Sequence, residues 1–197
     1  NLDTSEYERK LIIKTPASEY EFSLEDAIKE HHKENGDRTK SWNTFIKLAN
    51  SGNPEAKFWA GLYLYHDMCN QPIDEAERKF RTCRAAEFFK ASADECDTSN
   101  VQSYVDKAQL HFAYCLWNGK GIKKNYIKAI EYFKKAALGG NPYAMYNYGI
   151  ILYEGIYVHA DRNQGEMYLK LAADKQVQEA IDFCNTNNLM QLTPSNQ

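Results

Sequence analysis

The chain has no apolar run long enough to cross a membrane and no excess of charge of either sign. The longest apolar stretches, such as Tyr148 to Tyr153, fall far short of the roughly 20 residues of a membrane-spanning helix, and no signal-peptide core is visible. The 24 basic and 27 acidic residues nearly balance, and clusters such as Lys120, Lys123 and Lys124 are no larger than a loop. We therefore expect no membrane insertion and no nucleic-acid binding, and interpret these lysines as solvated.

Motifs of catalysis are also missing. There is no Gly-x-Ser-x-Gly, no phosphate-binding glycine loop and no His-Glu-x-x-His. The histidines are scattered, and each suits a surface or packed position better than a catalytic one: His31, His32, His66, His111 and His159. We therefore expect no enzymatic activity, no catalytic residue and no cofactor.

Cysteine is scarce, with five residues in the chain, and no two form a Cys-x-x-Cys pair. Cys115 and Cys184 fall on apolar helix faces and are interpreted as buried small side chains. His66 lies three residues before Cys69, which leaves a zinc site as an alternative to the prediction of no metal. The odd count and irregular spacing favour a reducing compartment such as the cytoplasm. The cysteines are Cys69, Cys83, Cys96, Cys115 and Cys184.

The chain does contain an internal repeat, between Ala108 and Ala180. The interval is 36 residues, since 144 − 108 and 155 − 119 both equal 36. Self-similarity at a period of about 20 to 50 residues is typical of solenoids, in which each unit buries its apolar face against its neighbours. The recurring small residues are Ala108, Gly119, Ala136 and Ala137, then Ala144, Gly155, Ala172 and Ala173.

Each unit is predicted to be helix, turn, helix, turn. After Ala108 the apolar residues follow helical spacing, and Gly119 suits a helix end with positive φ. Asn125 is the predicted N-cap of a second helix, and Asn141-Pro142 the start of the next unit. Small residues would let facing helices approach to roughly 8 Å, and they are Ala113, Ala136, Ala137, Gly149, Ala172 and Ala173.

Two successive units share one order of residues. The first reads Ala108, Phe112-Ala113, Gly119-Lys120-Gly121-Ile122, Asn125, Lys128-Ala129, Tyr132-Phe133, Ala136-Ala137 and Gly140, and the second Ala144, Tyr148-Gly149, Gly155, Asp161, Tyr168 and Ala172-Ala173. This order resembles the Sel1-like repeat family, a relative of the tetratricopeptide repeats, although Tyr157 replaces the second glycine and Gly165 an alanine. The resemblance implies an all-α, right-handed α/α solenoid of about four helix-turn-helix repeats plus a C-terminal capping helix.

The repeat register divides the chain. Residues 1–22 do not fit it and are expected to be an extended segment or a linker, because Thr15-Pro16 disfavours a continuous helix. A solenoid is predicted at 23–184, with Ser23 capping its first helix. Since the chain begins at Asn1, we expect it to be a piece of a longer protein. The predicted segments are repeats at about 23–52, 53–93, 101–140 and 141–174, a capping helix at 176–186 and a flexible tail at 187–197.

The second repeat contains two insertions of eight residues. Ala56 aligns with Ala108 at an offset of 52, whereas Ala93 aligns with Ala137 at an offset of 44, and Ala93 to Ala108 spans 15 positions instead of 7. Asp74 is predicted to cap an early start of one helix, and residues 101–107 to extend the next helix backwards. Insertions often map to a binding face, but elongation without a ligand explains them equally well.

Aromatic residues occupy equivalent positions on the first helices. The resemblance implies that these helices line a concave surface, where tyrosine and tryptophan would offer contact area at low entropic cost. The alternative is that the rings pack between repeats. The predicted partner-binding residues are Tyr65, Trp117, Tyr153, Tyr146, Tyr114, His111 and Phe58.

The predicted function is therefore a protein-protein interaction module, an adaptor or scaffold that is part of a larger protein and binds a peptide or helix on its concave face. Two alternatives come from other classes. One is a structural module that orients a neighbouring domain or self-associates. The other is a weak hydrolase, or a metal-dependent activity near His66 and Cys69.

Overall fold

The computed structural model describes residues 4–11, 22–68, 74–95 and 102–189, and within them the chain forms helices and turns without a β-strand. The all-α class is therefore confirmed. The helices are α1 (Thr4–Lys10), α2 (Leu24–His32), α3 (Arg38–Asn50), α4 (Pro54–Tyr65), α5 (Glu75–Ala93), α6 (Gln102–Asn118), α7 (Tyr126–Leu138), α8 (Pro142–Glu154), α9 (Arg162–Asp174) and α10 (Gln178–Thr186).

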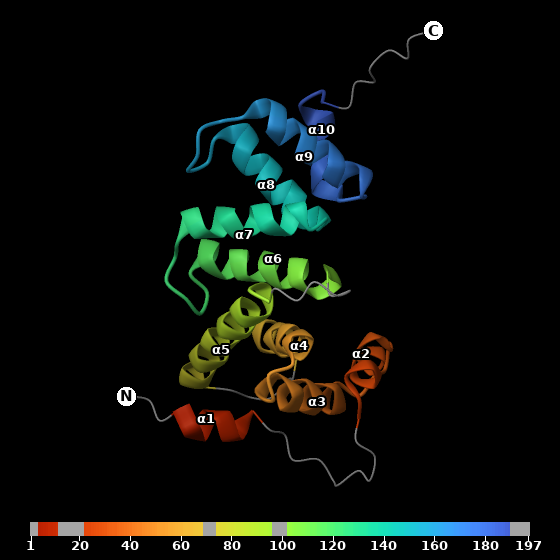
Figure 1. The fold of residues 1–197 in the computed structure, drawn as a ribbon, viewed down its shortest axis with the longest axis vertical. Helices are drawn as coiled ribbons and strands as arrows, with labels where there is room; N and C mark the ends of the chain where they lie inside the picture. Colours follow the sequence, from red (N-terminus) through yellow and green to blue (C-terminus); the bar gives the residue numbers. More distant parts are fainter. Residues whose placement is uncertain (1–3, 12–21, 69–73, 96–101, 190–197) are drawn as a thin grey trace.

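Helices α2 to α9 form four consecutive pairs, and each pair packs on the next. Within the pairs α2 packs on α3, α4 on α5, α6 on α7 and α8 on α9, and between them α3 packs on α4, α5 on α6 and α7 on α8. Figure 1 shows the pairs following one another along the long axis of the molecule in the order of the sequence. Contacts are thus mainly between neighbours in the chain, which is the organisation of a solenoid.

Polar N-cap side chains start the helices at residues that the sequence predicted. Side-chain oxygens of Ser23, Asp74, Asn125 and Asn141 accept the backbone N–H three residues on, at 3.1, 2.7, 3.0 and 3.1 Å. Each bond satisfies a helix N–H that lacks a partner within the helix, and such caps contribute about 1 kcal/mol. At the other end of α6, Gly119 has a φ of 70°, as expected for the residue that ends a helix.

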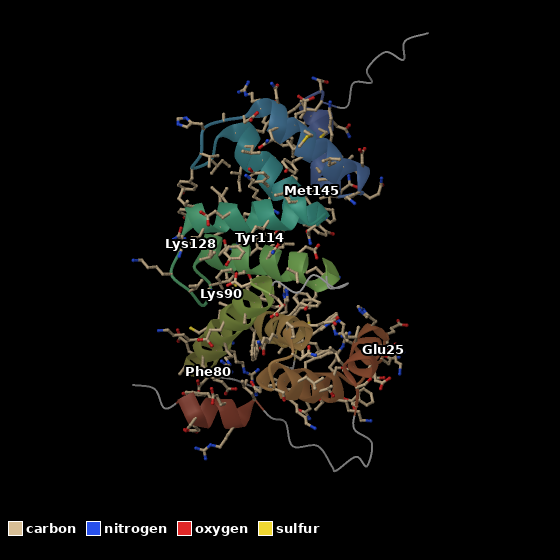
Figure 2. The ribbon with its side chains drawn as sticks, in the orientation of Figure 1. Glu25, Phe80, Lys90, Tyr114, Lys128 and Met145 are labelled. Atoms are coloured by element: carbon tan, nitrogen blue, oxygen red, sulfur yellow. The ribbon has the colours of Figure 1, made fainter. Side chains whose placement is uncertain are left out.

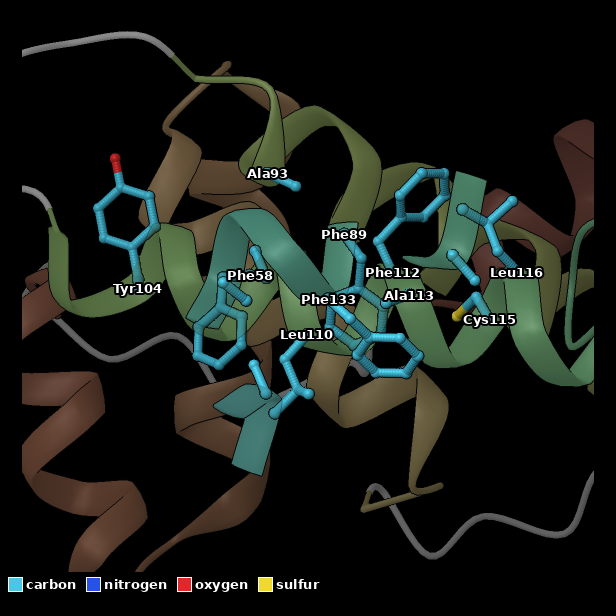
Figure 3. Close-up of a cluster of buried hydrophobic side chains, with 14 of the residues drawn as sticks. Phe58, Phe89, Ala93, Tyr104, Leu110, Phe112, Ala113, Cys115, Leu116 and Phe133 are labelled. Atoms are coloured by element: carbon cyan, nitrogen blue, oxygen red, sulfur yellow. The ribbon is translucent and has the colours of Figure 1, made fainter. Parts of the chain in front are cut away.

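Small residues lie where the helices approach one another, as predicted. Ala113, Ala136, Ala137, Ala172 and Ala173 each expose 3% or less of their surface. Larger side chains from four consecutive helices meet beside them in one cluster (Figure 3), which includes Phe58, Phe89, Leu110, Phe112, Leu116 and Phe133. Burying such a side chain stabilises the fold by about 1.5–3 kcal/mol, so this cluster joins the second pair to the third.

Gly165 of α9 allows this helix to pack closely against α8. A Cβ atom at Gly165 would lie 2.6 Å from the backbone nitrogen of Tyr153, and one at Gly149 would lie 3.1 Å from the Gly165 oxygen. Ala129, which holds the equivalent position in the preceding repeat, is fully buried. The departure from the family order at Gly165 therefore lets α9 approach α8 more closely than alanine would allow.

The inserted residues lengthen two helices. Helix α5 has 19 residues and α6 has 17, whereas α7, α8 and α9 have 13 each. Arg81, which is 5% exposed, holds the added turns of α5: its guanidinium lies 2.7 Å from Glu77 Oε1 and 3.1 Å from Asp67 Oδ1. Because Asp67 follows α4, this ion-pair group ties the α4–α5 connection to the elongated helix. Residues 69–73 and 96–101 lie outside the described part.

The N-terminal segment differs from the expectation of an extended chain or linker. Residues 4–10 form α1, and the Tyr7 ring stacks on Phe80 of α5 with centroids 5.4 Å apart. Leu11 is 4% exposed, and its carbonyl accepts a hydrogen bond from Trp42 Nε1. These apolar contacts explain why α1 packs against α5, which the repeat register did not predict. Residues 12–21, with the Thr15-Pro16 pair, lie outside the described part.

The C-terminal helix α10 packs on α9 and covers the end of the stack. Its apolar residues Ala180 and Cys184 are fully buried, and Val177 is 3% exposed. Of the predicted tail, only residues 187–189 are described. Among the helices of the described residues, none combines the length and apolar character needed to cross a membrane.

Candidate interaction surface

The predicted contact residues come from the first helices of three successive pairs, α4, α6 and α8. Tyr65, Trp117 and Tyr153 lie near the C-terminal ends of these helices, and all three are partly exposed. Each ring also contacts a residue of the following pair or of α10. The structure therefore combines the two expectations for these rings, because they pack between repeats and still reach the surface.

Tyr65 and His111 belong to an aromatic cluster between α4, α5 and α6. The His111 ring stacks on Phe89 with centroids 5.0 Å apart and planes 17° apart, and it lies 6.0 Å from both Tyr65 and His66. Tyr65 in turn meets Phe89 edge to face at 5.8 Å. Aromatic pairs at these distances stabilise by about 0.5–1.5 kcal/mol beyond their buried area, so these contacts favour the observed positions of the rings.

Burial keeps His111 uncharged at neutral pH. Together with a smaller effect of the neighbouring His66, burial lowers the pKa of His111 from 6.5 to about 4. Burial likewise lowers the pKa of His66, with Lys120 acting in the same direction. His111 Nδ1 is buried and has no hydrogen-bond partner among the described residues, so charging this ring would cost free energy.

Lys120 covers the Tyr65 end of the cluster. Its ammonium nitrogen lies 3.5 Å from the centroid of the Tyr65 ring and donates a hydrogen bond to the Tyr65 carbonyl at 3.1 Å. Burial lowers the pKa of Lys120. The solvated role predicted for this lysine is therefore wrong, because a cation–π contact and a carbonyl acceptor hold it against α4.

Trp117 belongs to a second aromatic group, formed by α6, the start of α7 and the loop between α8 and α9. Its ring lies edge to face against Tyr126 at 5.1 Å and Tyr157 at 5.9 Å, and Tyr126 and Tyr157 stack in parallel at 4.2 Å. Tyr157 has a φ of 58°, close to the 75° of Gly121 at the same place in the preceding repeat. The tyrosine thus keeps a backbone conformation that favours glycine and fills the space with a ring that is 55% exposed.

Tyr114 connects α6 to α8 through a hydrogen bond. Asn147 Nδ2 donates to the Tyr114 hydroxyl at 2.8 Å and to the Tyr143 carbonyl at 2.7 Å. Burial raises the pKa of Tyr114 and of Tyr146, so both phenols remain protonated at neutral pH. The surface therefore offers uncharged polar atoms among its rings, a composition that suits contact with a peptide.

The last ring, Tyr153, packs against α10. Its centroid lies 5.4 Å from Phe183, edge to face, and the Arg162 guanidinium lies 5.6 Å from the ring. The helix that covers the end of the stack thus also bounds the aromatic surface. Figure 2 shows Tyr114, near the middle of this surface, at the centre of the stack.

One predicted contact residue lies in the core. Phe58 is 3% exposed and packs against Trp59, Phe89 and His111. Its ring therefore supports the surface from beneath and is not accessible to a partner. The equivalent Tyr146 is partly exposed because the last pair has only α10 beyond it.

Sequence reasoning did not single out several supporting residues. Phe89, Tyr126, Asn147 and Phe183 come from second helices, a turn of α8 and the terminal helix, and only the folded stack brings them beside the predicted residues. Tyr157 did give a signal, since it stands where the repeat order has glycine. Because Tyr157 lies in the loop between α8 and α9, its ring partners Trp117 and Tyr126 come from the preceding helix pair.

Metal-binding groups do not assemble in the described part of the chain. No cluster of three or more histidine, cysteine or acidic side chains occurs there. Cys115 and Cys184 are buried, as predicted, and burial raises the pKa of the Cys115 thiol to about 12. Cys83 is half-buried. Cys69, considered above for a zinc site with His66, lies outside the described residues, as does Cys96.

Comparison with known proteins finds similarity to one repeat family over part of the chain. The sequence model of the Sel1 repeat matches residues 106–141 and 142–177. A crystal structure of a protective antigen of uropathogenic Escherichia coli strains, described as displaying an SLR fold, superposes with a TM-score of 0.65 at 23% identity. The match covers 87% of this chain and 34% of that one, so this chain spans about a third of its length. A Sel1 repeat protein from Oxalobacter formigenes superposes with a TM-score of 0.56 at 20% identity over 72% of this chain and 95% of that one.

Proposed function

Since this chain carries two Sel1 repeats within an α/α solenoid, we propose that it is an interaction module that holds an extended peptide or a helix of a partner protein. Sel1 repeats are generally protein-protein interaction modules and typically non-catalytic scaffolds. The finer part of the proposal is the location. The partner lies along the first helices α4, α6 and α8, over the rings of Tyr65, Trp117 and Tyr153.

The observation that supports this location is the partial exposure of rings from successive pairs. Tyr65, Trp117, Tyr153, Tyr114 and His111 are half-buried, so their positions are fixed by packing while part of each ring reaches solvent. A partner that covers them pays little side-chain entropy, because the rings are already ordered. Aromatic anchors of this kind contribute most of the binding energy at many interfaces.

The test compares partner recovery by the wild-type chain and by a variant that combines Tyr65→Ala, Trp117→Ala and Tyr153→Ala. Both serve as bait in lysate of the source cell, and recovered proteins are identified by mass spectrometry. The control combines Met167→Ala and Leu171→Ala, which remove exposed apolar side chains from the second helix α9. We expect a partner that the control retains and the aromatic variant loses.

Because the three rings also pack in the stack, loss of folding has to be separated from loss of binding. Circular dichroism and thermal unfolding of each variant provide that check. The single variant Tyr143→Ala serves as a folding control. It removes an α8 ring that is 53% exposed and contributes little to packing, so it should unfold at the same temperature as wild type. A folded aromatic variant that recovers the same partners as wild type would refute the location.

A further inference from the structure

A basic pocket lies on a different part of the molecule, between the second helices α5 and α7. It has a volume of about 550 Å³. Its floor comes from α6 and the α6–α7 loop, and five lysines surround it with one acidic residue, Glu131. None of the predicted contact residues of the first helices lines it. The floor is Phe112, Leu116 and Ile122, and the lysines are Lys90, Lys123, Lys124, Lys128 and Lys135.

At one end of the pocket the positive charge is balanced within the protein. Lys90 Nζ lies 2.5 Å from Asp94 Oδ2, and the Tyr132 hydroxyl donates to Asp94 Oδ1 at 2.6 Å. Burial opposes ionisation of Asp94, but the hydrogen bonds from Lys90 and Tyr132 lower its pKa overall. Lys135 lies over the Tyr132 ring at 4.7 Å. Asp94 therefore neutralises much of the charge at this end.

At the other end the charge is not balanced. Lys123, Lys124 and Lys128 are exposed and form no ion pair with the described residues. Lys128 lies in the first turn of α7, which contains no acidic residue. The N-terminus of a helix carries a partial positive charge and favours acidic side chains by about 0.3–1 kcal/mol. Three lysines at this point disfavour the fold slightly, so a bound anion would offset their repulsion.

We infer that this pocket binds an acidic segment of a protein, with carboxylates at Lys123, Lys124 and Lys128 and an apolar side chain over Ile122, the partly exposed residue of the floor. Figure 2 shows Lys90 and Lys128 on the same side of the stack, from successive second helices. The charge pattern orients the segment, because its acidic end belongs at the unbalanced lysines and its apolar end toward Asp94. The inference does not rest on the function proposed for the first helices.

Size and charge favour a short peptide over a longer polyanion. A pocket of about 550 Å³ accommodates only a few side chains. The whole chain has a net charge of −3, which does not favour the general attraction of a polyanion such as nucleic acid. An apolar floor would also contact leucine or phenylalanine favourably, whereas it offers no favourable contact to phosphates.

The test uses fluorescein-labelled peptides and fluorescence anisotropy with the full chain. The probe is Glu-Glu-Glu-Glu-Leu-Phe with an amidated C-terminus, and two others replace either its glutamates by glutamine or its Leu-Phe pair by Ser-Ser. The pocket variant is Lys124→Glu with Lys128→Glu. Its control is Lys79→Glu with Lys134→Glu, two exposed lysines of α5 and α7 outside the pocket, so that both proteins carry the same net charge.

We expect the glutamate probe to bind more tightly than either altered probe. The pocket variant should weaken it by about tenfold or more, since reversing charges changes attraction into repulsion, and the control should change it far less. Binding should also weaken as salt rises. The folded state should be unharmed, because Lys128→Glu places an acidic residue in the first turn of α7.

Three outcomes would overturn the inference. One is no binding of the glutamate probe, and another is equal loss in the pocket variant and the control, which would reflect net charge alone. The third is tighter binding of a thymine oligonucleotide or of phosphatidylserine vesicles, with loss in the pocket variant, which would assign the lysines to another kind of anion. The alanine variant at Tyr65, Trp117 and Tyr153 should keep probe binding, so failure here and failure of the proposed function are distinguishable.

Discussion

Acidification should destabilise this protein through His111, and the substitution His111→Phe should remove that effect. His111 is packed against Phe89 at 5.0 Å, its Nδ1 lacks a partner among the described residues, and burial lowers its pKa to about 4. In the unfolded chain the pKa is near 6.5. A proton therefore binds the unfolded chain more readily than the folded one, and the stability from a neutral His111 is complete above pH 6.5.

As pH falls from 6.5 through about 4, that stability is lost. Each pH unit in this window costs about 1.4 kcal/mol, and the whole difference corresponds to about 3 kcal/mol. Between pH 7.5 and 5.0 we therefore expect a loss of about 2 kcal/mol from this residue. His31, whose pKa burial and Arg38 also lower to about 4, adds to the loss in wild type and variant alike.

The assay is urea unfolding at a series of pH values for wild type, His111→Phe and the control His159→Phe, an exposed position. The free-energy difference between wild type and His111→Phe should shift by about 2 kcal/mol in favour of the variant on going from pH 7.5 to 5.0. His159→Phe should follow wild type. Since carboxylates titrate in all three proteins, only the differences are compared. A constant difference between wild type and His111→Phe across this range would refute the reasoning.

Three further predictions concern stability at neutral pH and can be checked by urea unfolding. Gly165→Ala should lower the free energy of unfolding by about 1–3 kcal/mol, because the new Cβ would lie 2.6 Å from the Tyr153 backbone nitrogen. This overpacking should outweigh the gain in helix propensity. An unchanged urea midpoint would mean that α8 and α9 separate easily. Tyr157→Gly should be more stable than Tyr157→Ala by about 1 kcal/mol, since φ is 58° and only glycine adopts it without strain; equal stabilities would contradict the strain. Arg81→Met should destabilise by about 3–5 kcal/mol, because it leaves the Glu77 carboxylate buried without its partner, and adding Glu77→Met should recover part of that loss.

Much of the fold followed from local chemistry and from the repeat. The helix starts at Asn125 and Asn141 depend on a side chain and a backbone N–H three residues away, so a sequence pattern suffices to predict them. Small residues recur at the repeat interval, Ala136 as Ala172 and Ala113 as Gly149, because every pair needs the same close contact. The end of α6 at Gly119 follows from the backbone freedom of glycine.

The candidate surface could be predicted only in part. Register identified Tyr65, Trp117 and Tyr153, but it could not distinguish a ring at the surface from one in the core, and Phe58 proved to be buried. Exposure depends on what the neighbouring pairs place on each ring. Lys120 shows the same limit, since its position over the Tyr65 ring joins residues 55 positions apart in the chain.

The sequence by itself therefore determined helices α2 to α10, their order and the interval of the stack, because capping, periodicity and small-residue contacts act over a few residues and recur with each unit. Only the tertiary structure decided which rings stay exposed, that residues 4–10 fold back onto α5, and that five lysines from α5, the α6–α7 loop and α7 surround one pocket. The physical reason is that burial, pKa and charge balance depend on side chains that neighbouring pairs contribute across their boundaries, and no local pattern records them.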